Sequence, residues 1–234
     1  MIDLSTKKFF PVIHCVPLED GGIGHALANT KVAMQNNADG VFLIGHRMVY
    51  DDLCYIYEHV RKQHPELWIG INFLDVSIHQ QPNTMLDLVK KCEGLNALWT
   101  DMMPLDSTWK EQLDVSIFSG VAFKYIDSQQ SGAALESACQ NAKRFCDIAT
   151  TSGDKTGSPP DVQKLEAIKK YLDGKIPLAV ASGVSEENVK KLLPYVDIFL
   201  VASSICEASK SLGGHEYLIP GRVKALAWKI HQYY

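Results

Sequence analysis

Five polar residues stand where short apolar segments of the sequence end, and their types suit proton transfer. They are Lys124, His46, Asp101, His14 and Asn72. Lys124 follows the apolar residues 121–123, and partial burial at that place would lower its pKa. Such a lysine can form a Schiff base, act as a base or hold an anionic substrate. We predict catalytic roles for Lys124, His46, Asp101 and His14, and a substrate-binding role for Asn72.

Each of these residues also has a structural interpretation. Lys124 could pair with Asp101 in a salt bridge that has no catalytic role. His14 could be a hydrogen-bonded core residue, and the Asn72 amide could be a structural tie, since buried amides need partners. Asp101 with His14 or His46 could bind a metal. Carboxylates and imidazoles are too common at such places to indicate one, so no metal and no cofactor is predicted.

Two segments near the end of the sequence change from apolar residues to glycine and serine. The apolar residues 178–181 and 196–201 each lead into such a turn, and Ser185 is the predicted N-cap of the helix after the first. We also predict a short extra helix after the second turn. A helix start offers free backbone N–H groups and the positive end of its dipole to an anion. The predicted phosphate site comprises Ser182, Gly183, Val184, Ser203 and Ser204.

A long polar loop lies between these turns and the middle of the chain. Residues 151–161 read TSGDKTGSPPD, with two glycines and several hydrogen-bonding side chains. Loops of this length can close over a substrate. We therefore predict that Thr151, Ser152, Lys155 and Thr156 bind substrate. The alternative is a surface loop rich in turn-forming residues.

The elements that must position these residues repeat about every 29 residues, as in a chain of eight βα units. One (β/α)8 barrel over residues 1–234 is predicted, and an open doubly wound sheet is the competing fold. The strand at 115–124 should end at Lys124. Predicted helices are 25–37, 50–63, 83–92, 135–144, 162–172, 186–193 and 222–233, with a short element near 108–113. The other predicted strands are 9–16, 40–44, 68–73, 97–100, 147–150, 178–181 and 198–201.

Composition excludes several classes of function. The 234 residues carry a formal charge of −4, and no basic run indicates nucleic-acid binding. No stretch of apolar residues is long enough to span a membrane, and the first residues lack a signal-peptide core. Six cysteines without a C-x-x-C pair suggest reduced thiols in the cytoplasm. The sequence leaves the oligomeric state open, a homo-oligomer included.

The glycine-rich segments resemble those of the BtpA-like family of (β/α)8 proteins, relatives of the phosphate-binding barrels. The resemblance rests on residues 151–161, 181–189 and 203–204, and more loosely on 11–14 and 70–74. Ala202 stands where the family pattern has glycine, and the segments 19–22 and 45–47 also differ. The family's name reflects a role in photosystem I assembly, while barrels of similar build handle phosphosugars and phosphoribosyl compounds.

Two functions are compatible with these residues. The first is an enzyme that acts on a phosphorylated sugar or phosphoribosyl metabolite, as an isomerase, lyase or transferase. The second is a catalytically silent barrel that binds a metabolite or a partner protein, as an assembly factor would. Lys, His, Asp and Asn around one barrel mouth favour the enzyme, because a silent barrel has no need of them.

Overall fold

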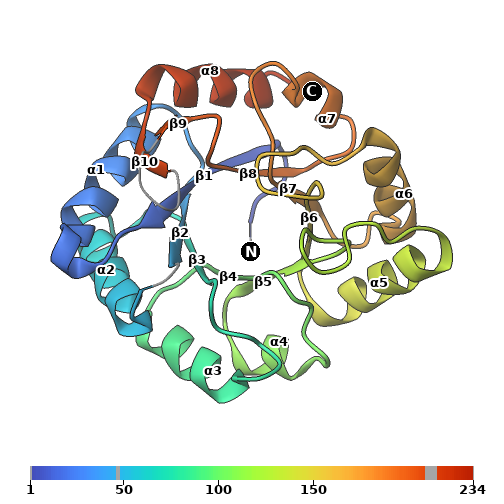
Figure 1. The fold of residues 1–234 in the computed structure, drawn as a ribbon, viewed down its shortest axis with the longest axis horizontal. Helices are drawn as coiled ribbons and strands as arrows, with labels where there is room; N and C mark the ends of the chain where they lie inside the picture. The colour runs from blue at the N-terminus through green and yellow to red at the C-terminus, as the bar shows by residue number, and fades with distance from the viewer. Residues whose placement is uncertain (1, 46–47, 209–214, 234) are drawn as a thin grey trace.

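The computed structural model describes residues 2–45, 48–208 and 215–233, and it shows eight parallel strands closed into a barrel. Each strand pairs with the next along the chain, and the last pairs with the first (Figure 1). This order confirms the predicted (β/α)8 fold. The strands are β1 (Lys8–Cys15), β2 (Val41–Gly45), β3 (Ile69–Phe73), β4 (Ala97–Thr100), β5 (Ser116–Gly120), β6 (Ile148–Thr151), β7 (Leu178–Ala181) and β8 (Ile198–Val201).

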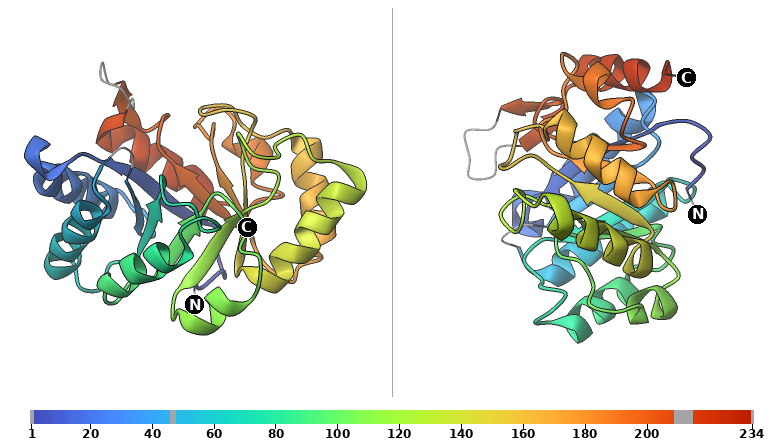
Figure 2. Two further views of the ribbon diagram at one scale, coloured as in Figure 1. Left: turned by 60° about the horizontal axis from the view of Figure 1, so that its bottom comes forward. Right: turned by 90° about the vertical axis from the view of Figure 1, so that its right-hand side faces the viewer.

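Helices follow the strands and cover the outside of the barrel (Figures 1 and 2). A short 3-10 helix, η1 (Leu18–Asp20), precedes the first of them. The α-helices are α1 (Gly22–Gln35), α2 (Tyr50–Gln63), α3 (Pro82–Lys91), α4 (Thr108–Gln112), α5 (Gly132–Phe145), α6 (Val162–Leu172), α7 (Val189–Leu192) and α8 (Pro220–His231). Within the described ranges, no helix is both long and apolar enough to cross a membrane.

Three predictions about the helices and strands differ most from the structure. Helix α7 is a single turn whose N-cap is Asn188, so the predicted helix 186–193 is too long and Ser185 does not cap it. After β8 the chain forms a turn and then β9 (Cys206–Ala208), which pairs antiparallel with β10 (His215–Leu218), in place of the predicted extra helix. Strand β5 ends at Gly120, before the predicted end at Lys124.

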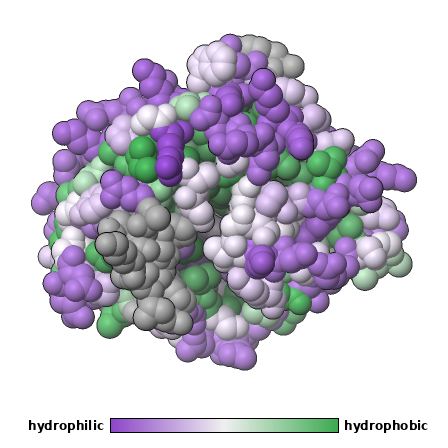
Figure 3. Space-filling view, turned by 45° about the horizontal axis from the view of Figure 1, so that its top comes forward, coloured by the Kyte–Doolittle hydropathy of each residue, from purple (hydrophilic) through white to green (hydrophobic). Residues whose placement is uncertain are grey.

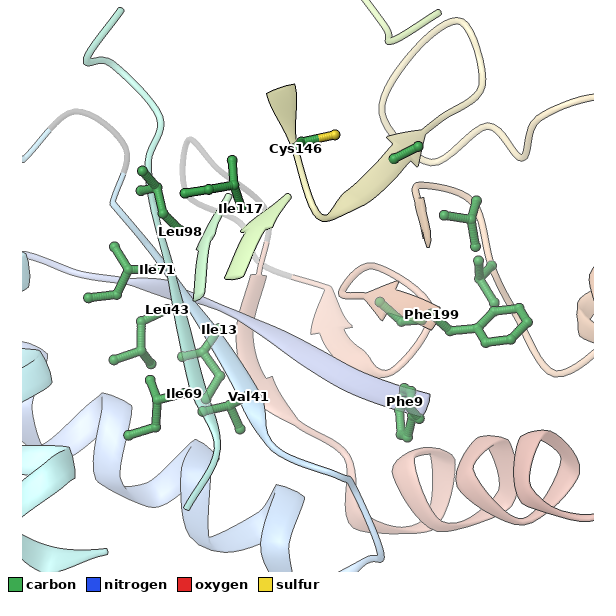
Figure 4. Close-up of a cluster of buried hydrophobic side chains, with 14 of the residues drawn as sticks. Phe9, Ile13, Val41, Leu43, Ile69, Ile71, Leu98, Ile117, Cys146 and Phe199 are labelled. Carbon is green, nitrogen blue, oxygen red and sulfur yellow. The ribbon is translucent and has the colours of Figure 1, made fainter. Parts of the chain in front are cut away.

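Side chains alternate along each strand between the surrounding helices and the barrel interior. Outward residues such as Phe9, Ile13, Leu43, Ile71 and Phe199 are buried in the larger hydrophobic cluster (Figure 4). Inward residues form a second cluster, made of Phe10, Val12, Phe42, Ile44, Ala97, Trp99, Phe118, Phe123, Ile148, Ala179, Ala181, Ile198 and Leu200. The barrel is therefore a packed core and not a channel.

Aromatic rings meet around Phe42 inside the barrel. Phe42 packs edge-on to Phe10 and Trp99, with centroids 5.8 Å apart in both pairs, and to Phe118 at 5.1 Å. Gly70, on the neighbouring strand β3, leaves room for this ring, since a Cβ there would overlap it. The absence of a side chain at position 70 thus lets one large ring sit at the centre of the barrel.

We expect Gly70→Ala to lower the free energy of unfolding by about 1–3 kcal/mol, because the added Cβ would overlap the Phe42 ring. Gly24→Ala is the matched control. A Cβ at this position of α1 meets no atom within 4 Å, so that substitution should raise the free energy of unfolding by about 0.5–1 kcal/mol. Urea unfolding followed by circular dichroism measures both. A Gly70→Ala variant as stable as wild type would contradict this packing.

Candidate functional site

A cavity of about 850 Å³ opens at the C-terminal ends of the barrel strands. Seen from one side, the molecule has a mainly hydrophilic surface with hydrophobic residues in its recesses (Figure 3). Active sites of (β/α)8 enzymes lie at this end of the strands. The cavity is lined by Val12, His14, Ile44, Leu74, Trp99, Asp101, Lys124, Tyr125, Thr156, Gly157, Pro159, Ala181, Ser182, Gly183, Val184, Ser185, Asn188, Leu200, Val201, Ala202, Ser203 and Ser204.

Lys124 reaches this cavity from a tight turn after β5. Two non-glycine residues of the turn, Ala122 and Tyr125, adopt left-handed backbone conformations, with φ of 46° and 63°. Such residues persist only where the surroundings hold them, and they occur often at functional sites. The Lys124 ammonium group lies 5.5 Å from the centre of the buried Phe123 ring, within range of a cation–π attraction.

Hydrogen bonds from β6 and α6 hold the turn in place. The Lys164 ammonium group, on α6, donates to three backbone carbonyls, those of Ala122 (2.6 Å), Ser128 (2.9 Å) and Ser152 (2.8 Å). Ser152 Oγ accepts from the Lys124 N–H at 2.7 Å. Burial lowers the pKa of Lys164, against the opposing charge of Asp154. Lys164 therefore ties the loop after β5 to the loop after β6.

Asp101 is a half-buried carboxylate that lines the cavity. Its Oδ1 accepts a hydrogen bond from the Asn72 amide at 3.3 Å. Burial raises the pKa of Asp101, and the Lys124 charge and the Asn72 bond oppose that rise only in part. Among the described residues, no ion pair joins Lys124 to Asp101. The salt-bridge interpretation of Lys124 is therefore wrong, although the two groups influence each other.

The predicted residues of the first half of the chain reach the site unequally. His14 is half-buried near the end of β1 and lines the cavity. Asn72 is buried and does not line it, so its amide acts on Asp101 and not directly on the cavity. His46 lies outside the described residues.

The loop at 151–161 contributes one of its four predicted side chains to the cavity. Thr156 lines it, and both its N–H and its hydroxyl contact the Tyr125 hydroxyl, at 3.1 and 3.3 Å. Thr151 and Ser152 are buried behind the wall, where they bond to the turn at 122–124. Lys155 is exposed, and its carbonyl accepts from Ser182 Oγ at 3.2 Å.

The two predicted phosphate turns lie side by side at the rim, and all five of their predicted residues line the cavity. Ser204 Oγ donates to the Val184 carbonyl at 2.6 Å. Gly183 has a φ of 62°, and a Cβ there would overlap the backbone of residues 158–159. Among the described residues, no hydrogen bond uses the N–H of Gly183, Val184 or Ser204. These donors are available to an anion.

The dipole argument for this site is wrong, because no helix of useful length starts at either turn. What remains is a set of backbone N–H groups in a tight turn, and turns of this kind can bind anions.

Four residues of this site are not predicted from the sequence: Lys164, Trp99, Tyr125 and Asn188. Within the described parts, no group of three His, Cys, Asp or Glu side chains is placed to hold a metal ion.

Comparison with known proteins identifies the family. Residues 105–231, more than half of the chain, match the BtpA family. The chain belongs to the BtpA family. An uncharacterized protein of Archaeoglobus fulgidus is 33% identical over 90 residues, which are 38% of this chain and 35% of that protein. The match thus spans about a third of the relative. The part that matches the BtpA family contains Lys124, Lys164 and both turns, and it excludes His14, Asn72 and Asp101.

Solved structures share the fold of this BtpA-family chain at low sequence identity. Mycobacterium tuberculosis tryptophan synthase has a TM-score of 0.69 and 13% identity, over 97% of this chain and 94% of that one. Thiamine phosphate pyrophosphorylase from Pyrococcus furiosus has a TM-score of 0.65 and 12% sequence identity, over 97% of this chain and 98% of that one. N-(5'-phosphoribosyl)anthranilate isomerase from Pyrococcus furiosus has a TM-score of 0.61 and 14% sequence identity, over 95% of this chain and 98% of that one.

We expect Asp101→Asn to change how the free energy of unfolding depends on pH. Because burial raises the pKa of Asp101, the folded protein keeps a proton that the unfolded chain releases. The resulting stabilisation is complete below the ordinary aspartate pKa and is lost as the pH rises through the raised value. The asparagine variant has no such loss.

Urea unfolding between about pH 2.5 and pH 7 measures this difference, because this range lies on both sides of the ordinary aspartate pKa. The free energy of unfolding of wild type, relative to that of Asp101→Asn, should fall as the pH rises. Asp106→Asn is the control with the opposite sign, since hydrogen bonds from Thr108 lower the pKa of that exposed carboxyl. Parallel pH profiles for wild type and Asp101→Asn would contradict the raised pKa.

Proposed function

We propose that this BtpA-family chain is an enzyme acting on a phosphorylated sugar or phosphoribosyl metabolite, as an isomerase, lyase or transferase. One observation carries the proposal. The same cavity is lined by Lys124, Asp101 and His14 and by the two turns, where no hydrogen bond among the described residues uses the N–H of Gly183, Val184 or Ser204. Groups that bind an anion and groups that move protons therefore face one space.

The phosphate would accept hydrogen bonds from the N–H groups of Gly183, Val184 and Ser204. Gly183 has a left-handed backbone conformation, which is one component of the turns that bind anions through backbone N–H groups. The bond from Ser204 Oγ to the Val184 carbonyl fixes the distance between the two turns. Donors that are held in place before the ligand arrives bind it at a lower entropic cost.

The proposed catalytic groups come from three strands: Asp101 follows β4, Lys124 follows β5, and His14 lies on β1, the neighbour of β8. Lys124 serves as the cation, base or Schiff-base former, and its ammonium group lies 5.5 Å from the centre of the Phe123 ring. Asp101 keeps its proton to higher pH than an exposed carboxyl does, which suits a general acid. His14 is the partner for proton transfer, and Asn72 orients Asp101. The predicted role of His46 stays a prediction.

The names of two structural neighbours, a thiamine phosphate pyrophosphorylase and an N-(5'-phosphoribosyl)anthranilate isomerase, are in keeping with this proposal. The second candidate function is a metabolite-binding or assembly-factor barrel without turnover. It is favoured by the extent of the family match, which includes the turns and leaves out Asp101 and His14.

A panel of ribose 5-phosphate, phosphoribosyl compounds and inorganic phosphate tests the enzyme against its rival. Saturating phosphate should stabilise wild type by about 2–4 kcal/mol, which raises the melting temperature by several degrees. Ser204→Ala should weaken phosphate binding about tenfold by freeing one turn from the other. Lys124→Ala should bind inorganic phosphate and lose turnover, whereas Lys169→Ala, a change at an exposed lysine of α6, should behave as wild type.

Each result decides one part of the proposal. No thermal shift with millimolar phosphate compounds would contradict the phosphate site. Binding without turnover of any compound would favour the second function. Equal turnover by wild type and Lys124→Ala would remove the lysine from the mechanism. Trapping of a substrate adduct by borohydride in wild type alone would make Lys124 a Schiff-base former.

A further inference from the structure

Apolar side chains of the barrel interior form part of the cavity wall. Val12 of β1, Ile44 of β2 and Leu200 of β8 come from three neighbouring strands and face the cavity. We call these three residues the apolar wall. Asp101 and Lys124 follow β4 and β5, which lie across the barrel from them. The apolar wall therefore lies across the cavity from Asp101 and Lys124, while His14 also lines the cavity from β1.

The apolar wall has no group that could hydrogen-bond to a ligand. The three side chains are nearly fully buried, at 2–4% exposed. Sugar hydroxyl groups packed against them would lose their hydrogen bonds to water and gain none in return. A carbon-rich group would instead leave water for an apolar surface, which is favourable. Ligand sites combine apolar walls with a few polar groups in this way.

The size of the cavity agrees with a second group beside the phosphate. Its 850 Å³ lies near the upper end of the range of about 300–1,000 Å³ for sites that hold drug-sized ligands. The phosphate would lie at the rim of the cavity, beside the turns at Gly183 and Ser204. Leu74 and Trp99 extend the apolar lining below Asp101 and give it a flat aromatic surface.

From this geometry we infer that the substrate is a phosphate ester that also carries a ring-sized apolar group, and not a simple phosphosugar. The phosphate lies at the rim, the ring packs on the apolar wall and Trp99, and its polar edge faces Asp101 and Lys124. The inference rests on the proposed function for the phosphate end alone. It narrows the substrate class to aryl or heteroaryl phosphate compounds, phosphoribosyl conjugates of such rings included.

Titration calorimetry with phenyl phosphate, ribose 5-phosphate and inorganic phosphate tests the inference. Phenyl phosphate should bind at least tenfold more tightly than either of the others, because its ring is buried. Val12→Thr keeps the shape of the wall and adds one hydroxyl group, so it should weaken phenyl phosphate binding several-fold and leave inorganic phosphate unaffected. Val180→Thr, an outward position of β7 away from the cavity, is the matched control.

The outcomes separate the two proposals. If ribose 5-phosphate binds as tightly as phenyl phosphate, the inference is wrong while the phosphate site stands. If Val12→Thr binds phenyl phosphate as wild type does, the ring does not lie on the apolar wall, and the inference is again overturned. If none of the three compounds binds, the inference falls together with the proposed function.

Discussion

The ammonium group of Lys164 determines how the mouth of this barrel is built. It donates to carbonyls from two different loops, at Ala122, Ser128 and Ser152, with distances of 2.6–2.9 Å. A cation at this point donates charge-assisted hydrogen bonds to three part-buried backbone oxygens. One of these bonds is to Ala122, a left-handed residue of the turn that carries Lys124. The position of the proposed catalytic lysine thus depends on a second lysine that does not line the cavity.

The barrel below the mouth supplies the other constraint. Alternation along the strands packs one set of side chains under the helices and the other inside the barrel, where Phe42 occupies the room that Gly70 leaves. Because the interior is filled, polar residues can enter the barrel only near the carboxyl ends of the strands, where Asn72 and Asp101 bond to each other. The position of a residue along its strand therefore decides whether it supports the core or faces a ligand.

The sequence predicts this architecture well because strand alternation and helix periodicity are local patterns. The predicted ranges 50–63, 97–100, 162–172, 178–181 and 198–201 match α2, β4, α6, β7 and β8. Errors arise where the local pattern is ambiguous. A glycine–serine turn looks the same whether a long helix, a four-residue helix or a hairpin follows, so the helices at both turns are predicted wrongly. The role of Lys164 cannot be predicted from the sequence. Its carbonyl partners at 122 and 128 are distant along the chain, and amphipathic surface helices commonly carry similar lysines.

The three hydrogen bonds from Lys164 indicate that the turn carrying Lys124 is formed before any ligand binds and that Lys164 holds it. Hydrogen exchange of the ligand-free protein tests this most directly, at the amides of Val121, Lys124 and Asp127, which bond to Thr150, Ser152 and Phe123. Wild type should protect these amides, Lys164→Met should lose the protection, and Lys169→Met, which removes a single exposed bond to the Pro194 carbonyl, should keep it. Equal protection in all three proteins, or none in wild type, would contradict the claim.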